Sequence, residues 1–147
     1  MGVPAIGCTC KVCQSKDPHD KRLRASAMVE TERTRILIDP GPDFRQQMLG
    51  QSFRKIDAVL VTHIHYDHVG GLDDIRPFCQ FGEVNVYADE ITSRALMNTV
   101  PYCFAENRYP GAPKINLIGA DDPCICRTTA ALLVADFNMA FPAIGDF

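Results

Sequence analysis

One stretch of the chain, His63-Ile64-His65-Tyr66-Asp67-His68, holds three of the four histidines and a carboxylate within six residues. The residues before it, 56–61, form an apolar run rich in β-branched side chains, which predicts a buried strand. Alternate side chains of an extended segment point the same way, so His63 and His65 could share one metal ion. Asp67 and His68 point elsewhere, toward the turn expected at 70–71, and could hold a second ion, as in two-metal hydrolytic sites. Imidazole and carboxylate together favour zinc, iron or manganese over calcium or magnesium.

The alternative is a set of surface histidines in a polar turn. A lone histidine usually deserves that interpretation. A His-x-His-x-Asp-His run at the end of a strand is much less expected than a lone histidine unless it has a function. We therefore interpret the stretch as a metal site.

This motif resembles that of the metallo-β-lactamase-fold hydrolases, which carry His-x-His-x-Asp-His after a strand. The resemblance implies that His63 and His65 bind one metal, that Asp67 and His68 bind the other, and that a bridging water is the nucleophile. Within the family, the Gly-Leu extension and the cysteine cluster near residue 8 are most similar to the cyclic phosphodiesterase of the carbon–phosphorus lyase pathway. That similarity extends over roughly residues 2–119.

The 147 residues are expected to form a single α/β domain. The resemblance implies a four-layer αββα sandwich of two similar halves, and complete family members are much longer. The family also takes a further histidine for each metal, and a bridging aspartate, from later segments, yet no histidine follows His68. Residues 1–147 are therefore expected to be an incomplete domain that covers mainly the first half of the fold. Asp136 is the only late carboxylate considered as a bridge, and without an accompanying histidine it is not assigned that role.

A second cluster, of three cysteines among the chain's seven, lies at Cys8, Cys10 and Cys13. Cys-x-Cys-x-x-Cys supplies three of the four ligands of a tetrahedral structural zinc, and the alternative is three free thiols. His19 is the only nearby histidine, whereas the resembling group takes its fourth ligand from a late histidine that this sequence does not contain. Such an ion would clip the cysteine-containing loop, residues 8–24, to the body and do no chemistry. The later pair Cys124 and Cys126 is expected to be unliganded.

Charge and hydropathy limit the partners. A net charge of −3 and a pI near 5.7 leave no electrostatic footprint for nucleic acid, so a small phosphorylated substrate is favoured. The basic residues 21–24 are at most a weak anion site. The chain has no apolar run of membrane-spanning length and no signal-peptide pattern, so we expect a cytoplasmic protein with no membrane partner. A homodimer is an expectation by analogy with the family.

The remaining pattern alternates short strands and helices. Residues 26–30 and 34–38 predict a hairpin that ends at Asp39, which either supports the metal loop, as in the resembling family, or only forms a turn. Asp43 is expected to cap a helix through residue 48, and residues 73–78 a short helix broken by Pro77. A strand is expected at 83–88, followed by a helix that Asp89 caps. Its core-facing residues are expected to be Ile91, Ala95, Leu96 and Val100.

Two segments carry less information. The aromatic loop at 101–113 could wall a substrate pocket or be a surface connection. Residues 130–137 form an apolar run that predicts a further strand.

The functional hypothesis is metal-assisted hydrolysis of a phosphodiester, with a small cyclic one as the expected substrate, two zinc or manganese ions, and Asp67 as a candidate proton relay. Three alternatives remain open. They are an RNA-processing nuclease of the same fold, redox chemistry at a single iron as in the persulfide dioxygenase branch, and a non-catalytic zinc-binding module.

Overall fold

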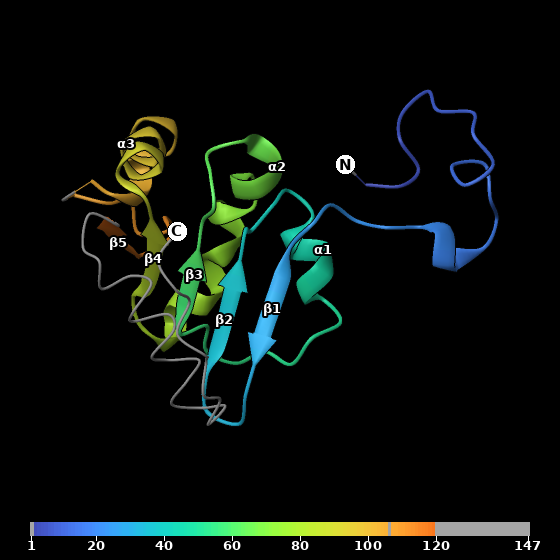
Figure 1. Ribbon diagram of the computed structural model, residues 1–147. Helices are drawn as coiled ribbons and strands as arrows, with labels where there is room; N and C mark the ends of the chain where they lie inside the picture. The colour runs from blue at the N-terminus through green and yellow to red at the C-terminus, as the bar shows by residue number, and fades with distance from the viewer. Residues whose placement is uncertain (1, 106, 120–147) are drawn as a thin grey trace, which may run out of the picture.

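The computed structural model describes residues 2–105 and 107–119, and its centre is a mixed five-stranded sheet in the order β1-β2-β3-β4-β5 (Figure 1). β1 pairs antiparallel with β2, and every later neighbour is parallel. The strands are β1 (Ala27–Glu30), β2 (Arg35–Ile38), β3 (Ala58–Leu60), β4 (Val84–Ala88) and β5 (Ile115–Gly119). Because β2, β3 and β4 run parallel, they end at the same edge of the sheet. Loops that follow these strands therefore meet there.

The crossovers are short helices. They are α1 (Phe44–Met48), α2 (Tyr66–Val69), the 3-10 helix η2 (Leu72–Phe81), α3 (Glu90–Thr99) and η3 (Pro101–Cys103), with η1 (Pro18–Asp20) in the N-terminal loop. Two strand expectations, the hairpin and the strand near 83–88, are confirmed. The helix expected at 73–78 is instead a ten-residue 3-10 helix that continues past Pro77 to Phe81.

The core lies on one face of the sheet. Strand residues of one parity, Leu37, Val59 and Val86 among them, are buried in the same cluster as the helix residues Phe44, Leu72, Ile75, Phe78 and Leu96. The described residues thus form one sheet and one helical layer, which is the half-sandwich that the sequence predicted. Truncating a side chain such as Leu96, which is completely buried, to alanine is expected to cost about 2–5 kcal/mol.

Two helix expectations are wrong in detail. Asp43 does not cap α1, because its carboxylate accepts hydrogen bonds from the Arg24 backbone N–H (2.8 Å) and Nη1 (2.6 Å). Ile91 is 80% exposed rather than part of the core. Asp89 does cap α3, accepting from the Thr92 backbone N–H at 2.6 Å.

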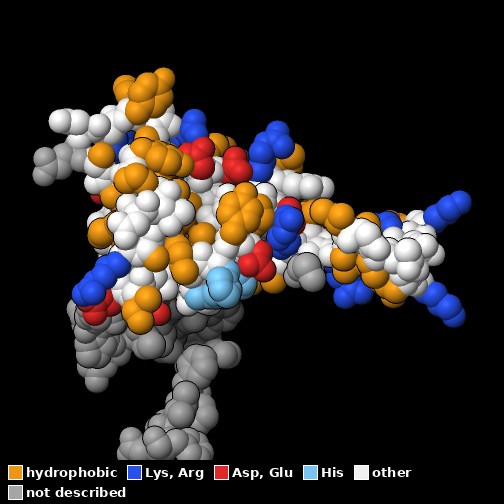
Figure 2. Space-filling model, turned by 90° about the horizontal axis from the view of Figure 1, so that it is seen from above, with side chains coloured by type: hydrophobic (Ala, Val, Ile, Leu, Met, Phe, Trp, Pro, Cys, Tyr) orange, Lys and Arg blue, Asp and Glu red, His pale blue; other side chains and the backbone are white. Residues whose placement is uncertain are grey.

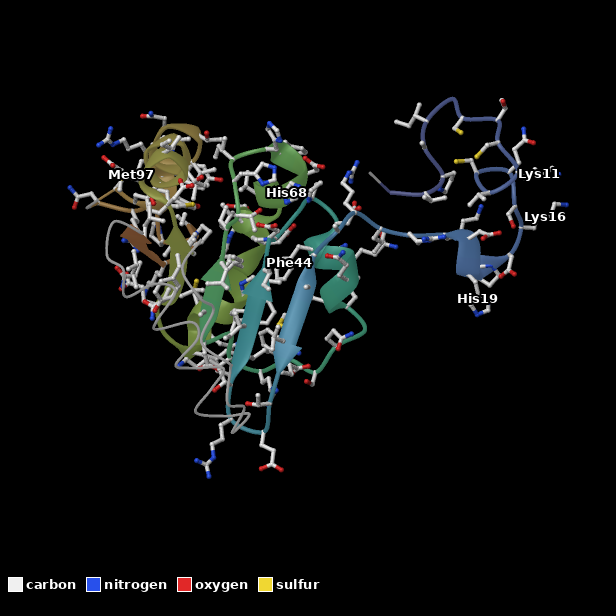
Figure 3. The ribbon with its side chains drawn as sticks, viewed as in Figure 1. Lys11, Lys16, His19, Phe44, His68 and Met97 are labelled. Carbon is white, nitrogen blue, oxygen red and sulfur yellow. The ribbon has the colours of Figure 1, made fainter. Side chains whose placement is uncertain are left out.

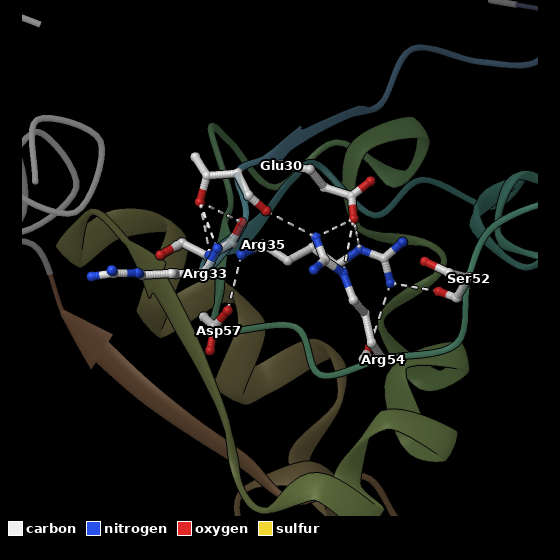
Figure 4. Close-up of polar contacts among 8 residues, drawn as sticks. Glu30, Arg33, Arg35, Ser52, Arg54 and Asp57 are labelled. Atoms are coloured by element: carbon white, nitrogen blue, oxygen red, sulfur yellow. Dashed lines mark hydrogen bonds and ion pairs between the residues drawn. The ribbon is translucent and has the colours of Figure 1, made fainter. Parts of the chain in front are cut away.

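The opposite edge of the sheet is held by a buried arginine (Figure 4). Arg35 donates from Nη1 to the carbonyls of Ser52 (2.8 Å) and Arg54, and its Nε lies 3.0 Å from Glu30 Oε1. Arg54 donates to the same Glu30 oxygen from Nε and Nη2. These hydrogen bonds from Arg54, with the charge of Arg35, lower the pKa of Glu30. The network ties the segment before β3 to the start of β2, and Asp57 completes it by accepting from the Arg35 backbone N–H.

The cysteine-containing loop projects away from the sheet at the N-terminal side (Figure 1). Expectations for Cys124, Cys126, residues 130–137 and Asp136 lie outside the described residues. No helix in the described part of the chain is both long and apolar enough to cross a membrane.

Candidate metal centre

The predicted metal loop lies at the edge where β2 and β3 end. Thr62, His63 and His65 follow β3, and His65 is the residue that precedes α2. Asp67 and His68 lie inside α2, a short helix that ends at the turn formed by residues 70–71. Figure 3 shows His68 at this edge, beneath α2 and above the sheet.

The structure brings the four predicted ligands together as two pairs. His63 Nε2 lies 3.1 Å from His65 Nδ1, and His68 Nε2 lies 3.9 Å from Asp67 Oδ2. The His63 and His68 rings link the pairs, with centroids 4.0 Å apart. Two ligand atoms about 2.1 Å from one tetrahedral ion are about 3.4 Å apart, close to both separations. The donor set and its spacing therefore fit two neighbouring divalent ions.

Asp39 orients the side chains of Thr62 and His68 by accepting hydrogen bonds from both. Its Oδ1 accepts from the Thr62 backbone N–H at 2.8 Å, and its Oδ2 accepts from Thr62 Oγ1 (2.8 Å) and from His68 Nδ1 (2.9 Å). A carboxylate can only accept, so His68 carries its proton on Nδ1 and its Nε2 keeps the lone pair that a metal needs. Asp39 is buried and has a φ of 54°, a conformation uncommon for residues other than glycine and typical of functional sites. It is thus a supporting residue and not only a turn former.

Thr62 fixes which ring nitrogen of His63 carries the proton. Its hydroxyl proton is donated to Asp39, so its oxygen must accept from His63 Nδ1, which lies 2.9 Å away. His63 therefore presents an unprotonated Nε2 to His65. Thr62 was not predicted as a functional residue, and its position directly before the first histidine was the only signal in the sequence.

Glycines let the two loops of the site pack backbone to backbone. A Cβ on Gly41 would lie 2.3 Å from the Asp67 carbonyl oxygen, and one on Gly71 would lie 2.2 Å from the Gly41 carbonyl oxygen. The Gly71 N–H also donates to the Pro40 carbonyl at 2.8 Å. The turn predicted at 70–71 is confirmed, since these two residues form the turn between α2 and η2, with negative φ at both. The glycines at 41 and 71 also allow the close approach of the two loops, which fixes Asp67 relative to Asp39.

The cysteine cluster is assembled as predicted. The Sγ atoms of Cys8, Cys10 and Cys13 all lie within 4.8 Å of one another, which within the described ranges makes them the only trio of possible ligands so close together. The Cys13 backbone N–H and the Cys8 side chain hydrogen-bond to Cys10 and lower its pKa to about 7. A thiolate near neutral pH is the form that binds zinc.

His19 is not brought to this cluster. Its side chain is 92% exposed and its Nδ1 contacts Asp17 Oδ1 at 2.8 Å. Figure 3 shows it below η1, on the side of the loop away from Lys11. The described residues therefore supply three ligands to this site.

The histidine site is open to solvent. Viewed from above its edge of the sheet, Figure 2 shows histidine side chains at the surface beside a carboxylate and hydrophobic side chains. The chain is thus an α/β protein with an exposed cluster of histidines and a carboxylate at the end of parallel strands, supported by a buried aspartate.

Comparison with known proteins identifies the family. The family model described as the beta-lactamase superfamily domain matches residues 34–139, most of the chain. The chain therefore belongs to the beta-lactamase superfamily. The crystal structure of a diphosphatase from the PhnP family is similar, with a TM-score of 0.70 and 44% identity over 82% of this chain and 46% of that one.

Two curated relatives are also similar. The octanoyltransferase of Porphyromonas gingivalis is 50% identical over 139 residues, which are 94% of this chain and 27% of that protein. Ribonuclease Z of Bradyrhizobium diazoefficiens is 42% identical over 57 residues, 37% of this chain and 19% of that protein. The chain thus matches less than half the length of each of these proteins.

Proposed function

We propose that this chain carries the first ligands of a two-metal hydrolase that cleaves a small phosphodiester, with a cyclic phosphate as the expected substrate. The observation that supports this most directly is the pairing of His63 with His65 and of Asp67 with His68. Asp39 hydrogen-bonds to one member of the second pair and, through Thr62, reaches one member of the first. The 44% identity to a diphosphatase supports phosphoryl chemistry, because phosphoanhydrides and phosphodiesters are cleaved by the same attack at phosphorus.

Two divalent ions, zinc or manganese, supply Lewis acidity at the phosphoryl oxygens and lower the pKa of water when bound. The chain's own residues determine where this happens. Asp39 and Thr62 keep the Nε2 atoms of His68 and His63 unprotonated and directed at the site. Asp67 is half-exposed, unlike the buried Asp39, so it is the carboxylate of this pair placed to carry the proton that the leaving alkoxide takes up.

We also propose a structural zinc at Cys8, Cys10 and Cys13, with a fourth ligand from outside the described residues. The convergent sulfur atoms and the lowered pKa of Cys10 support it. A four-coordinate ion there has no open position for a substrate, so it would order the loop without taking part in hydrolysis.

A second candidate is an RNA-processing nuclease, because the match to ribonuclease Z covers 57 residues at 42% identity. A polyanion requires clustered cations, and this chain has a net charge of −3 with its arginines largely paired to carboxylates, as in Arg24 with Asp43 and Arg54 with Glu30. A small substrate is therefore favoured. The name octanoyltransferase carries no argument for this site, since the match is 27% of that protein.

The test is hydrolysis by the intact protein loaded with zinc or manganese. Bis(p-nitrophenyl) phosphate, a ribose cyclic phosphate, a nucleoside diphosphate and a precursor tRNA would be compared as substrates. We expect turnover of the small phosphodiesters, loss of at least about 100-fold in His63→Ala and His68→Ala, and no loss in the matched control His19→Ala. Turnover that survives His63→Ala would contradict the proposal, and cleavage of the tRNA alone would favour the nuclease.

A further inference from the structure

The metal loop carries one large side chain that its own geometry does not use for metal binding. Tyr66 lies between the ligands His65 and Asp67 and is the first residue of α2. Its side chain is 72% exposed. Its backbone is part of the segment that carries both ligand pairs.

The ring of Tyr66 lies along α2, beside Gly70. A Cβ on Gly70 would lie 2.8 Å from its Cε2 and Cζ atoms and from its carbonyl oxygen. Gly70 has φ −63° and ψ −12°, which any residue can adopt, so glycine is not required here by the backbone conformation. The ring occupies the space where a side chain at residue 70 would begin. It therefore lies against the helix, with most of its surface exposed.

The exposed part of the ring carries no aromatic contact and no hydrogen bond within the described residues. Tyr66 takes part in none of the aromatic pairs found there, and no residue in these ranges hydrogen-bonds to its hydroxyl. Tyr102 differs, since it donates to Asp73 Oδ1 at 3.3 Å. A seated aromatic ring with an open surface next to a phosphoryl-binding site is a platform for a planar group.

We propose that Tyr66 stacks against an aromatic group of the substrate, so that the site takes phosphoesters of an aryl group or nucleobase in preference to small aliphatic ones. This rests on the proposed function, because it assumes that the phosphoryl group is held by the neighbouring ligand pairs. Tyr66 is then a specificity-determining residue. A stacked base contributes about 1–3 kcal/mol by alanine substitution, which corresponds to roughly 5- to 150-fold in affinity.

The experiment measures binding rather than turnover. Dissociation constants of methyl phosphate and phenyl phosphate would be determined by calorimetry for the intact zinc-loaded protein and for Tyr66→Ala, Tyr66→Phe and Ile91→Ala. Ile91 is a large side chain on α3 that is 80% exposed, so it is the control for loss of an exposed hydrophobic group. We expect the wild-type protein to bind phenyl phosphate about tenfold more tightly than methyl phosphate. That preference should vanish in Tyr66→Ala and persist in Tyr66→Phe and in the control, while the affinity for methyl phosphate stays the same throughout.

The outcomes separate the two proposals. Equal binding of both phosphates by the wild-type protein, or a preference that survives Tyr66→Ala, would overturn the role of Tyr66 and leave phosphate binding intact. Loss of affinity for both phosphates in Tyr66→Ala would also overturn it, because the ring would then support the metal site. If the wild-type protein binds neither phosphate, the proposed function fails and the stacking proposal fails with it.

Discussion

Replacing Asp39 with asparagine should switch the proton on a metal-binding histidine. Oδ2 of Asp39 accepts from both Thr62 Oγ1 and His68 Nδ1. An asparagine can keep the bond from the Thr62 backbone N–H to Oδ1, but its Nδ2 then faces two donors. His68 can keep a hydrogen bond only by accepting at Nδ1, which moves its proton to Nε2, the nitrogen that faces Asp67. Asparagine tolerates positive φ, so the backbone at residue 39 is retained.

Two magnitudes follow from this geometry. Losing the support of a ligating histidine is expected to weaken zinc binding at the histidine site about 10- to 100-fold. The unsatisfied donors should lower the free energy of unfolding by about 1–3 kcal/mol. Neither effect requires any change in the ligands themselves.

The assay is a zinc titration against a competing chelator, in a Cys10→Ser, Cys13→Ser background so that the thiolates do not contribute. Asp57→Asn is the matched control, because Asp57 also accepts from a backbone N–H but lies at the opposite edge of the sheet. It should lose stability without losing zinc affinity. If Asp39→Asn binds zinc as tightly as the wild-type protein, the assignment of Asp39 as the orienting residue is wrong.

Three further predictions concern packing, pH and the cysteines. Gly71→Ala should lower the free energy of unfolding in urea by about 1–3 kcal/mol, because its Cβ would meet the Gly41 carbonyl oxygen. Gly50→Ala is the control and should have no such effect, since a Cβ there meets nothing within 4 Å. Equal effects of the two substitutions would contradict the close packing. Because the pKa of Glu30 is lowered in the folded protein, its stabilising effect is complete above the unfolded pKa and is lost as pH falls through the folded pKa. In Glu30→Gln the free energy of unfolding should therefore fall less steeply below about pH 4.5 than in the wild-type protein. An equally steep fall in both proteins would refute this. Zinc should slow the alkylation of the three clustered thiols, Cys8, Cys10 and Cys13, as measured by mass spectrometry. Equal alkylation rates with and without zinc would exclude a metal at these cysteines.

Local sequence patterns predicted the parts of the fold that depend on neighbouring residues. The hairpin at 26–38 and the cap at Asp89 follow from strand periodicity and side-chain chemistry, and both are present. Asp43 has equally good capping chemistry but is bound to Arg24, 19 residues away, and no local signal reports that partner. Ile91 fits the helical period but lies on the exposed side of α3, because the sheet covers only part of that helix.

In the candidate site, too, the local features were predictable from the sequence and the long-range contacts were not. The ligand identities and the two pairs are readable from His63 to His68, because a strand end and a short helix fix their directions. The contacts that orient them join residues 23 to 29 positions apart, as Asp39 joins Thr62 and His68. The turn at 70–71 was predicted from its glycines, but the close backbone approach at Gly41 and Gly71 is visible only in three dimensions.

Anomalous diffraction at the zinc edge from crystals of the intact, zinc-loaded protein tests the central claim most directly. The account predicts two neighbouring peaks at the end of β3, one bound by His63 Nε2 and His65 Nδ1 and the other by Asp67 and His68 Nε2. A third peak is predicted at the three thiolates. Zinc at the thiolates alone, with none between the histidines, would contradict the account.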